Sequence, residues 1–146
     1  MVLEYDYVAG LFDGEGWCAI RRAPASLYGG KREWAYQCSV EMTMRERSIL
    51  EGLQELFGGT LREVKSRSDK HSQYWHWRAG GREAMYFAIA IADKSIAKKA
   101  QLWLLAEFQK EKTLQGNQPL GNTRYELYEK CFDKMKELNM KGQGKL

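Results

Sequence analysis

Two carboxylates, Asp13 and Glu15, stand among glycines near the beginning of the chain, in a combination that could hold a cation. The apolar residues before them recur at helical spacing, at Tyr5, Val8, Leu11 and Phe12. Gly14 and Gly16 predict the end of that helix, so both acids fall at its negative C-terminus. A hard divalent cation, held by carboxylate and backbone carbonyl oxygens, would suit this position. The alternative is a glycine-rich helix end whose acids are solvated.

The face of this helix turned away from its apolar residues carries Gly10 and Gly14, one turn apart. Glycine within a helix costs about 1 kcal/mol relative to alanine, so two glycines on one face need a reason. Close approach of the backbone to a second helix or to a ligand is such a reason. We therefore expect this face to contact one or the other.

Residues 8–16, VAGLFDGEG, resemble the LAGLIDADG motif of homing endonucleases and related maturases. They match the motif at Ala9, Gly10, Leu11, Asp13 and Gly16, with similar residues at Val8, Phe12 and Glu15. The resemblance implies that two motif helices pack together in a dimer, through Tyr7, Gly10, Asp13 and Gly14. It also implies that Glu15 and the carbonyl of Gly14 bind Mg²⁺ or Mn²⁺, and that Asp13 has a supporting or capping role.

The motif occurs once, so the resemblance implies a homodimer. This dimer would cut double-stranded DNA at a pseudo-palindromic site by metal-dependent phosphodiester hydrolysis, as in intron or intein homing. The second implied catalytic residue is Lys98, from the Lys-x-x-Gln pattern at residues 98–101, with Lys99 as the alternative. Where the family often has a polar residue at the end of its second strand, this chain has Met44, followed by Arg45. Glu15 favours the nuclease, whereas Met44 favours a non-cleaving binder such as an intron RNA maturase or a DNA-binding regulator.

Hydrophobic patterns along the rest of the chain predict the framework. Two hairpins are expected, with strands at residues 17–23 and 33–44 and at residues 60–67 and 72–79. Helices are expected at residues 45–57, 82–92 and 96–110, and a capping box at residues 123–126 predicts a terminal helix. Met85, Ala88, Ile89 and Ala92 should face inward, and Ser95 should cap the helix that follows it.

This order of elements predicts an α+β domain in which helices cover one face of antiparallel strand pairs. It is also the αββαββα order that the resemblance implies, a saddle whose antiparallel sheet forms the DNA-binding face while the helices pack on the other face.

The second strand alternates between apolar and polar residues, and the second hairpin is the most basic region of the chain. A basic β-ribbon fits the major groove of DNA. The residues expected to contact DNA are Arg21, Gln37, Ser39, Glu41, Arg62, Lys65, Arg67, His76 and Arg78. Because Arg62 and Lys65 are an odd number of positions apart, only one of them should lie on this face. The alternatives are a solvated polar face and an ordinary exposed hairpin.

Composition narrows the class of protein. The 146 residues suit one domain over residues 1–146, with a core at about 1–112 and a terminal helix at about 122–140. The net charge of +4 is compatible with nucleic acid but does not prove it. Three widely separated cysteines exclude a zinc module and a disulfide framework. With neither a long apolar run nor a basic leader, we expect no membrane contact and an intracellular location, in the cytoplasm, the nucleoid, or an organelle such as a chloroplast or mitochondrion.

Overall fold

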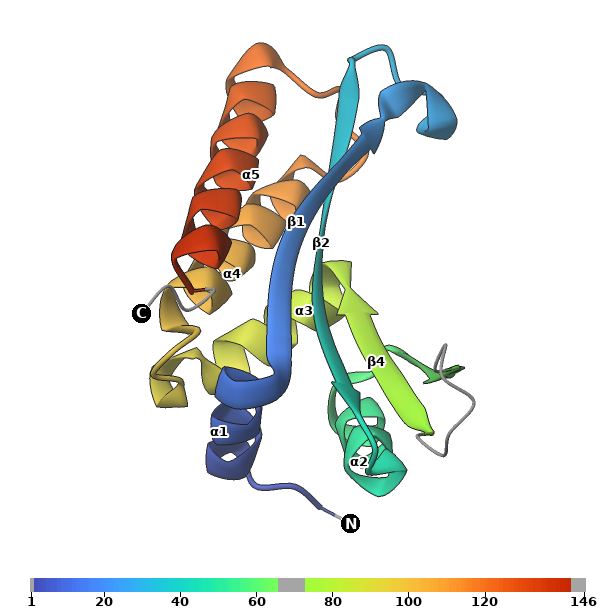
Figure 1. Cartoon of the computed structure of the whole chain (residues 1–146). Coiled ribbons are helices and arrows are strands. Elements are labelled where there is room, and N and C mark those ends of the chain that lie inside the picture. Colours follow the sequence, from blue (N-terminus) through green and yellow to red (C-terminus); the bar gives the residue numbers. More distant parts are fainter. Residues whose placement is uncertain (1, 66–72, 143–146) are drawn as a thin grey trace.

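The computed structural model describes residues 2–65 and 73–142. Its elements, labelled in Figure 1 where there is room, are α1 (Tyr5–Glu15), β1 (Gly16–Pro24), the short 3₁₀ helix η1 (Ala25–Tyr28), β2 (Trp34–Met44), α2 (Arg47–Phe57), β3 (Thr60–Val64), β4 (Tyr74–Gly80), α3 (Gly81–Ile91), the short 3₁₀ helix η2 (Ala92–Lys94), α4 (Lys99–Gln115) and α5 (Asn122–Gly142). The elements from α1 to α3 follow the predicted αββαββα order, so the prediction of an α+β fold with this topology is confirmed.

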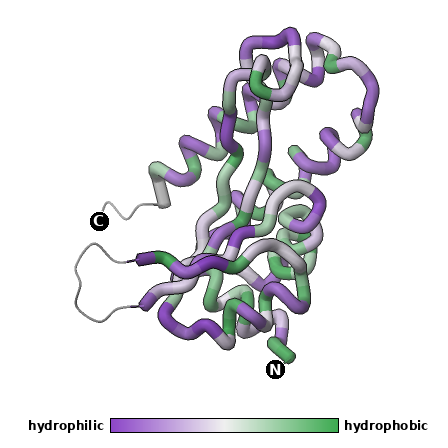
Figure 2. The backbone as a smooth tube through the Cα atoms, turned by 90° about the vertical axis from the view of Figure 1, so that its right-hand side faces the viewer, coloured by the Kyte–Doolittle hydropathy of each residue, from purple (hydrophilic) through white to green (hydrophobic). Residues whose placement is uncertain are grey.

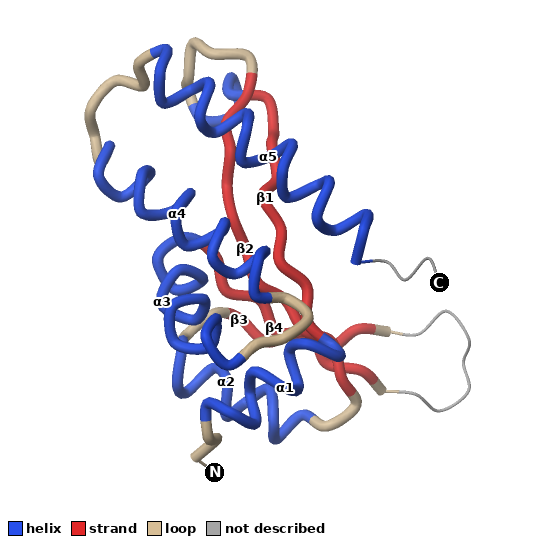
Figure 3. The backbone as a smooth tube through the Cα atoms, turned by 90° about the vertical axis from the view of Figure 1, so that its left-hand side faces the viewer, coloured by secondary structure: helices blue, strands red, loops and turns tan. Residues whose placement is uncertain are grey.

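The four strands form one antiparallel sheet in the order β1-β2-β4-β3. β2 pairs with the whole of β1, with Gly16 opposite Met42 and Pro24 opposite Trp34. β4 pairs only with the half of β2 that runs from Ser39 to Met44. Figure 3 shows α1 to α4 gathered on one side of the sheet, with α5 running back along β1. One face of the sheet is thereby covered, and the other face is left open.

Phe87 of α3 is the centre of the core between the helices and the sheet. Its ring centroid lies 5.0 Å from that of Phe12 on α1 and 4.9 Å from that of Phe57 on α2. The same ring lies 5.3 Å from Trp77 on β4. Aromatic pairs of this kind contribute about 0.5–1.5 kcal/mol each beyond the burial of their area. A single side chain therefore holds α1 and α2 against the sheet.

The predicted alternation of β2 is confirmed. Its inward side chains, Tyr36, Cys38, Val40 and Met42, are at most 3% exposed. On the opposite face Gln37 and Thr43 are exposed and Glu41 is half-buried. Ser39 on that face is the exception, because it is only 1% exposed. In Figure 2 the terminal helix α5 changes between hydrophilic and hydrophobic residues along its length, as expected of a helix with one buried face. That face carries the buried residues Tyr128, Cys131 and Met135.

The prediction that Ile89 faces the core is wrong, because this side chain is 52% exposed. The buried face of α3 consists instead of Ala84, Phe87, Ala88 and Ile91. α3 has apolar residues around much of its circumference, so its sequence does not fix which side faces the sheet.

Some element boundaries also differ from those predicted. The third strand ends at Val64, and residues 66–72 at the tip of its hairpin, with Arg67 among them, lie outside the described residues. α5 begins at Asn122, so Thr123 lies inside its first turn and not at the N-cap position that a capping box requires. No helix within residues 2–65 and 73–142 is both long and apolar enough to cross a membrane.

Candidate functional site

Helix α1 ends where the sequence places the two acids. Gly16 follows the last helical residue, Glu15, and its N–H donates to the carbonyl of Phe12. A Cβ on Gly16 would lie 2.1 Å from Cδ1 of Phe12, so only glycine lets the chain pass this buried ring and enter β1. Gly14 lies within the helix, and Gly16 alone therefore marks its end. The exposed Glu15 carboxylate is left at the negative end of the helix.

Asp13 is bound within the protein to the turn that precedes α4. Its carboxylate accepts hydrogen bonds from Ser95 Oγ, from the Ile96 N–H at 2.8 Å and from the Lys98 N–H at 3.2 Å. Burial alone would raise the pKa of Asp13, but the hydrogen bonds from Ser95 and from the backbone N–H groups of residues 96–98 outweigh it, so this pKa lies below its ordinary value of 3.8. The supporting role expected of Asp13 is thus to accept hydrogen bonds from the turn before α4. Its place in a dimer interface stays a prediction.

Ser95 does not cap α4 as predicted, since that helix begins at Lys99. Its Oγ accepts a hydrogen bond from the Lys98 N–H at 3.1 Å and thus closes the turn before the helix. The Lys98 ammonium lies 5.7 Å from the ring centroid of Trp17, two residues after Glu15. The fold thereby places Lys98 close to the C-terminal end of α1, although the two are far apart in the sequence.

The outer face of α1 is open. Tyr7 is 48% exposed, and Gly10 and Gly14 follow it at helical spacing and are exposed as well. A Cβ added at either glycine would meet no atom of the described residues within 4 Å. Nothing described within this chain therefore requires glycine at these two positions.

The register of the strands decides which polar residues share the open face of the sheet. Arg21 lies opposite Gln37, and Glu41 lies opposite Arg78. His76 pairs with Thr43 on β2 and with Arg62 on β3. Because paired residues of a sheet point to the same side, the predicted residues that share this face are Arg21, Gln37, Ser39, Glu41, Arg62, His76 and Arg78.

Of Arg62 and Lys65, it is therefore Arg62 that lies on the open face. Lys65 follows the end of β3 as an exposed residue, so its contact with DNA stays a prediction. Arg67 belongs to the segment that the structure does not describe.

A hydrogen-bonded network crosses the middle of this open face. The Glu41 carboxylate lies 2.7 Å from Arg21 Nη1 and 3.2 Å from His76 Nε2. Ser39 Oγ donates to the same carboxylate at 3.1 Å, and Thr43 Oγ1 lies 2.8 Å from His76 Nδ1. The sequence identifies Arg21, Glu41 and His76 one by one, but it does not show that Glu41 joins the other two across three strands.

The charges in this network shift two pKa values. Burial would raise the pKa of Glu41, but the hydrogen bond and the charge of Arg21 outweigh burial and lower this pKa. Burial lowers the pKa of His76, and the attraction of Glu41 only partly opposes that effect. The carboxylate is therefore ionised and the imidazole neutral at pH 7.

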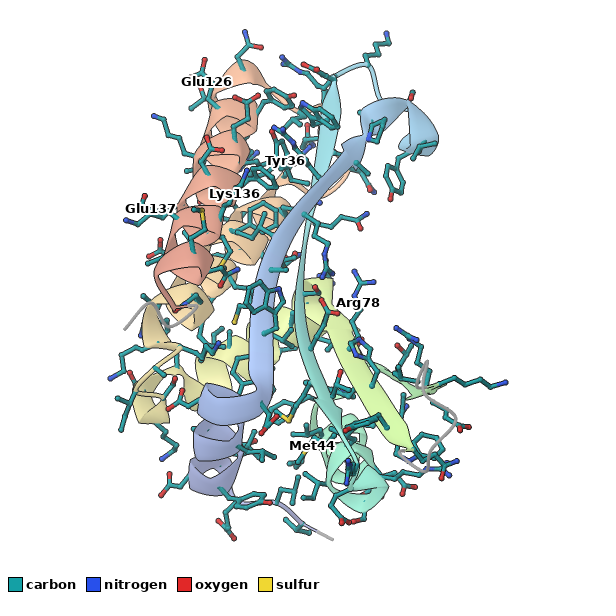
Figure 4. The ribbon with its side chains drawn as sticks, viewed as in Figure 1. Tyr36, Met44, Arg78, Glu126, Lys136 and Glu137 are labelled. Carbon is teal, nitrogen blue, oxygen red and sulfur yellow. The ribbon has the colours of Figure 1, made fainter. Side chains whose placement is uncertain are left out.

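Met44 belongs to the other face. It is the last residue of β2 and packs against the hydrophobic core, at the α2 end of the sheet in Figure 4. The neighbouring Arg45 bonds the Tyr74 hydroxyl at 3.1 Å, and the Arg47 guanidinium lies 4.4 Å from the Trp75 ring centroid. The polar residue at this end of the open face is Thr43.

Helix α5 adds residues that the sequence analysis did not predict. A groove of about 290 Å³ separates α5 from the edge of the open face, with Trp17 and Arg21 on one side and Lys136 and Asn139 on the other. Figure 4 shows Lys136 on the side of α5 toward β1 and Glu137 on its outer side. Asn139 Nδ2 donates to the Cys18 carbonyl at 2.9 Å and fixes this arrangement. In the sequence, the position of Lys136 beside β1 is indicated only by its place next to the buried Met135 on the same helix.

No cluster of three or more histidine, cysteine or acidic side chains within the described ranges is placed to hold a metal ion.

Comparisons with known proteins identify the fold. No family model matches the chain, and no curated protein matches it. Among solved structures, the homing endonuclease I-CvuI bound to DNA has a TM-score of 0.73 at 17% identity, over 92% of this chain and 80% of that one. The archaeal intron-encoded homing endonuclease I-Vdi141I bound to DNA has a TM-score of 0.72 at 19% identity, over 97% and 87%.

A third structure has a different length. The LAGLIDADG homing endonuclease I-GzeII bound to DNA has a TM-score of 0.64 at 18% identity, and the match covers 89% of this chain but only 44% of that one. The structural neighbours are thus LAGLIDADG homing endonucleases, and the chain has their fold.

The bonds of Asp13 predict a pH-dependent loss of stability. At pH 7 we expect Asp13→Asn to lower the free energy of unfolding by about 1–2 kcal/mol, because a charged acceptor of three donors becomes a neutral one. Since the folded-state pKa is depressed, this contribution is complete above the unfolded-state pKa and is lost as pH falls through the folded-state value. Urea denaturation at pH 7 and at about pH 3 should therefore give a difference that shrinks in acid. Asp133→Asn, at an exposed position of α5, is the control. A difference independent of pH would contradict this assignment.

Proposed function

We propose that this chain is a site-specific double-stranded DNA endonuclease that acts as a homodimer with a divalent cation. The observation that carries the proposal is the exposed Glu15 carboxylate, which ends α1 at the negative pole of the helix. Lys98 is joined to the same end of α1 by the hydrogen bond from its N–H to Asp13. A carboxylate without a cation is disfavoured there. The homing-endonuclease fold and the open basic face of the sheet support the same function.

The carboxylate and carbonyl oxygens at the end of α1 suit Mg²⁺ as ligands. This ion is usually held by one or two carboxylates together with waters and substrate phosphates, so a single exposed acid is sufficient from one chain. The last carbonyls of the helix, including that of Gly14, have no following turn to bond them. Two of the neighbouring I-CvuI complexes are described in the presence of divalent cations, one in 2 mM Mg with DNA not cleaved and one in 2 mM Ca.

The open face of α1 supports a homodimer. Among the described residues no atom lies within 4 Å of a Cβ built at Gly10 or Gly14, and Tyr7 on the same face is exposed. A second copy of α1 can therefore approach closely there. The match to only 44% of I-GzeII agrees with one chain supplying one half of such an assembly. Two α1 ends would then bring two Glu15 carboxylates together, and bound cations would relieve their repulsion.

The residues of each half have separate tasks. Bound Mg²⁺ would activate a water and neutralise charge on the leaving oxygen of the phosphodiester. Glu15 would hold that ion, and Asp13 holds the backbone of Lys98 through its hydrogen bond. The Lys98 ammonium would offset negative charge on the scissile phosphate. The open face of the sheet binds the major groove and selects the site.

A non-cleaving nucleic-acid binder on the same fold is the second candidate. The packing of Met44 into the core favours it, because the family resemblance implies a polar residue at the end of this strand. Cleavage assays separate the two functions, since a binder would enrich DNA or RNA sequences without releasing ends.

The first test is cleavage of a randomised palindromic DNA library in Mg²⁺. We expect Glu15→Gln to slow cutting of the selected site by about 10³-fold, because losing a metal ligand forfeits several kcal/mol of transition-state stabilisation. Binding in Ca²⁺ should change little. Glu55→Gln, an exposed acid on α2, should cut like wild type. Equal rates for the wild type and Glu15→Gln would show that the acid is assigned wrongly.

The second test separates the dimer from the fold of each chain. We expect Gly10→Leu to remain folded, because a Cβ there meets no atom within 4 Å and leucine has the higher helix propensity. The same change should dissociate the dimer, because the helices can no longer approach. Circular dichroism and sedimentation equilibrium measure the two effects. Glu55→Leu, also at an exposed helical position, should leave the mass unchanged, and a dimeric Gly10→Leu would exclude this interface.

The third test concerns the groove beside α5. Lys136 is exposed beside Arg21 and has no ion-pair partner among the described residues, so we propose that it contacts a phosphate. Lys136→Gln should weaken binding equally for all sequences and reduce the slope of log K against log salt by about 1. Lys134→Gln removes the same charge from a lysine 3.9 Å from Glu137 and should leave the slope unchanged. Equal slopes for the two variants would contradict a contact at Lys136.

A further inference from the structure

Glu41 is the only acid that the register places on the open face of the described strands. Its side chain is only 14% exposed, and positive groups surround it. A carboxylate turned toward a polyanion opposes binding, so charge attraction does not explain its presence. Because its side chain is mostly buried, we look for its function in the side chains that it bonds.

Each oxygen of this carboxylate has defined partners. Oε2 accepts from Arg21 Nη1 at 2.7 Å and from Ser39 Oγ at 3.1 Å. Arg21 Nη1 also donates to Ser39 Oγ at 3.2 Å. Glu41 and Ser39 together fix Nη1 of the Arg21 guanidinium on the side facing the sheet.

The other oxygen determines the state of His76. Oε1 lies 3.2 Å from Nε2 of the imidazole, and Thr43 Oγ1 lies 2.8 Å from Nδ1. Because the imidazole is neutral at pH 7 and the carboxylate can only accept, Nε2 carries the proton and Nδ1 accepts from the Thr43 hydroxyl. Both ring nitrogens are thus occupied within the network, and His76 has none left for a base.

Arg21 remains as the residue of this network that can reach outward. Its side chain is 49% exposed, and within residues 2–65 and 73–142 neither Nη2 nor Nε has a hydrogen-bond partner. Because Nη1 is fixed, the planar guanidinium presents its remaining N–H groups in one defined plane. Two parallel donors in that geometry match O6 and N7 of guanine in the major groove.

We propose that Arg21 reads a guanine in each half-site, and that Glu41, with Ser39, is the positioning residue that fixes the plane of its guanidinium. His76 holds Glu41 and makes no hydrogen bond to a base. The inference rests on the proposed DNA binding but not on cleavage. It assigns specificity to a carboxylate that itself weakens binding to DNA.

The test is the base preference at every position of the selected site, measured by competition binding in Ca²⁺. We expect the wild type to prefer guanine at one symmetric pair of positions by about 10- to 100-fold, the usual value of a bidentate pair. Arg21→Ala should abolish this preference. Glu41→Gln should reduce it by about tenfold at that position only, while binding to unrelated DNA becomes tighter.

Two further variants separate positioning from charge and from stability. Glu63→Gln removes the same charge from β3, where Glu63 accepts from Gln73 at 2.9 Å, and should tighten binding to unrelated DNA without altering base preference. Ser39→Ala removes the smaller support of Arg21 and should relax the same guanine position to a lesser degree, even where Glu41→Gln folds poorly.

The outcomes distinguish this inference from the proposed function. A selected site whose base preferences are the same in the wild type, Arg21→Ala and Glu41→Gln would overturn the inference and leave the endonuclease intact. A loss of preference spread over all positions would also overturn it, because positioning acts on one base. A wild type that enriches no DNA sequence would overturn both.

Discussion

The hydrogen bonds of the Asp13 carboxylate hold the candidate site together. They join the end of α1 to Ser95, Ile96 and Lys98 in the turn before α4. These residues are more than 80 positions away in the sequence, so no local contact places them beside Asp13. The motif helix therefore carries one acid that faces the protein and another, two residues later, that faces solvent. Asp13 is satisfied internally, and the proposal of a cation at this helix end therefore rests on Glu15.

The structure places two carboxylates, Glu15 and Glu41, in opposite electrostatic environments. Glu41 lies among Arg21, Ser39 and His76, and these partners offset the cost of its partial burial. Glu15 lies at the negative end of a helix, where an unpartnered acid costs about 0.3–1 kcal/mol. Arg21 bonds the Glu41 carboxylate directly, whereas no described residue forms an ion pair with Glu15. A satisfied acid suits a positioning role, whereas an unsatisfied one suits a metal ligand.

The sequence predicted what depends on local pattern and missed what depends on contacts between distant residues. The alternation of β2 and the order of elements follow from periodicity, and both are confirmed. The predicted orientation of α3 was wrong at Ile89, because the sequence of a largely apolar helix does not define which side faces the core. Ser95 has the residue type of a helix cap, but its partner is Asp13, 82 positions away. Likewise, the pairing of Arg62 with His76, and not the composition of β3, decides which basic residue shares the open face.

The edges of the sheet bear on how two copies could associate. β1 is an edge strand, and α5 lies along it with Asn139 bonded to the Cys18 carbonyl, so this edge has part of its hydrogen bonding supplied internally. The other edge, β3, has only five residues and carries the charged Arg62 and Glu63. Covered, short and charged edges resist strand pairing between molecules. The outer face of α1 differs, because its two glycines cost helix stability and have no neighbour in the described chain. Association through helices is therefore favoured over association through the sheet, and it leaves the open face available for a nucleic acid.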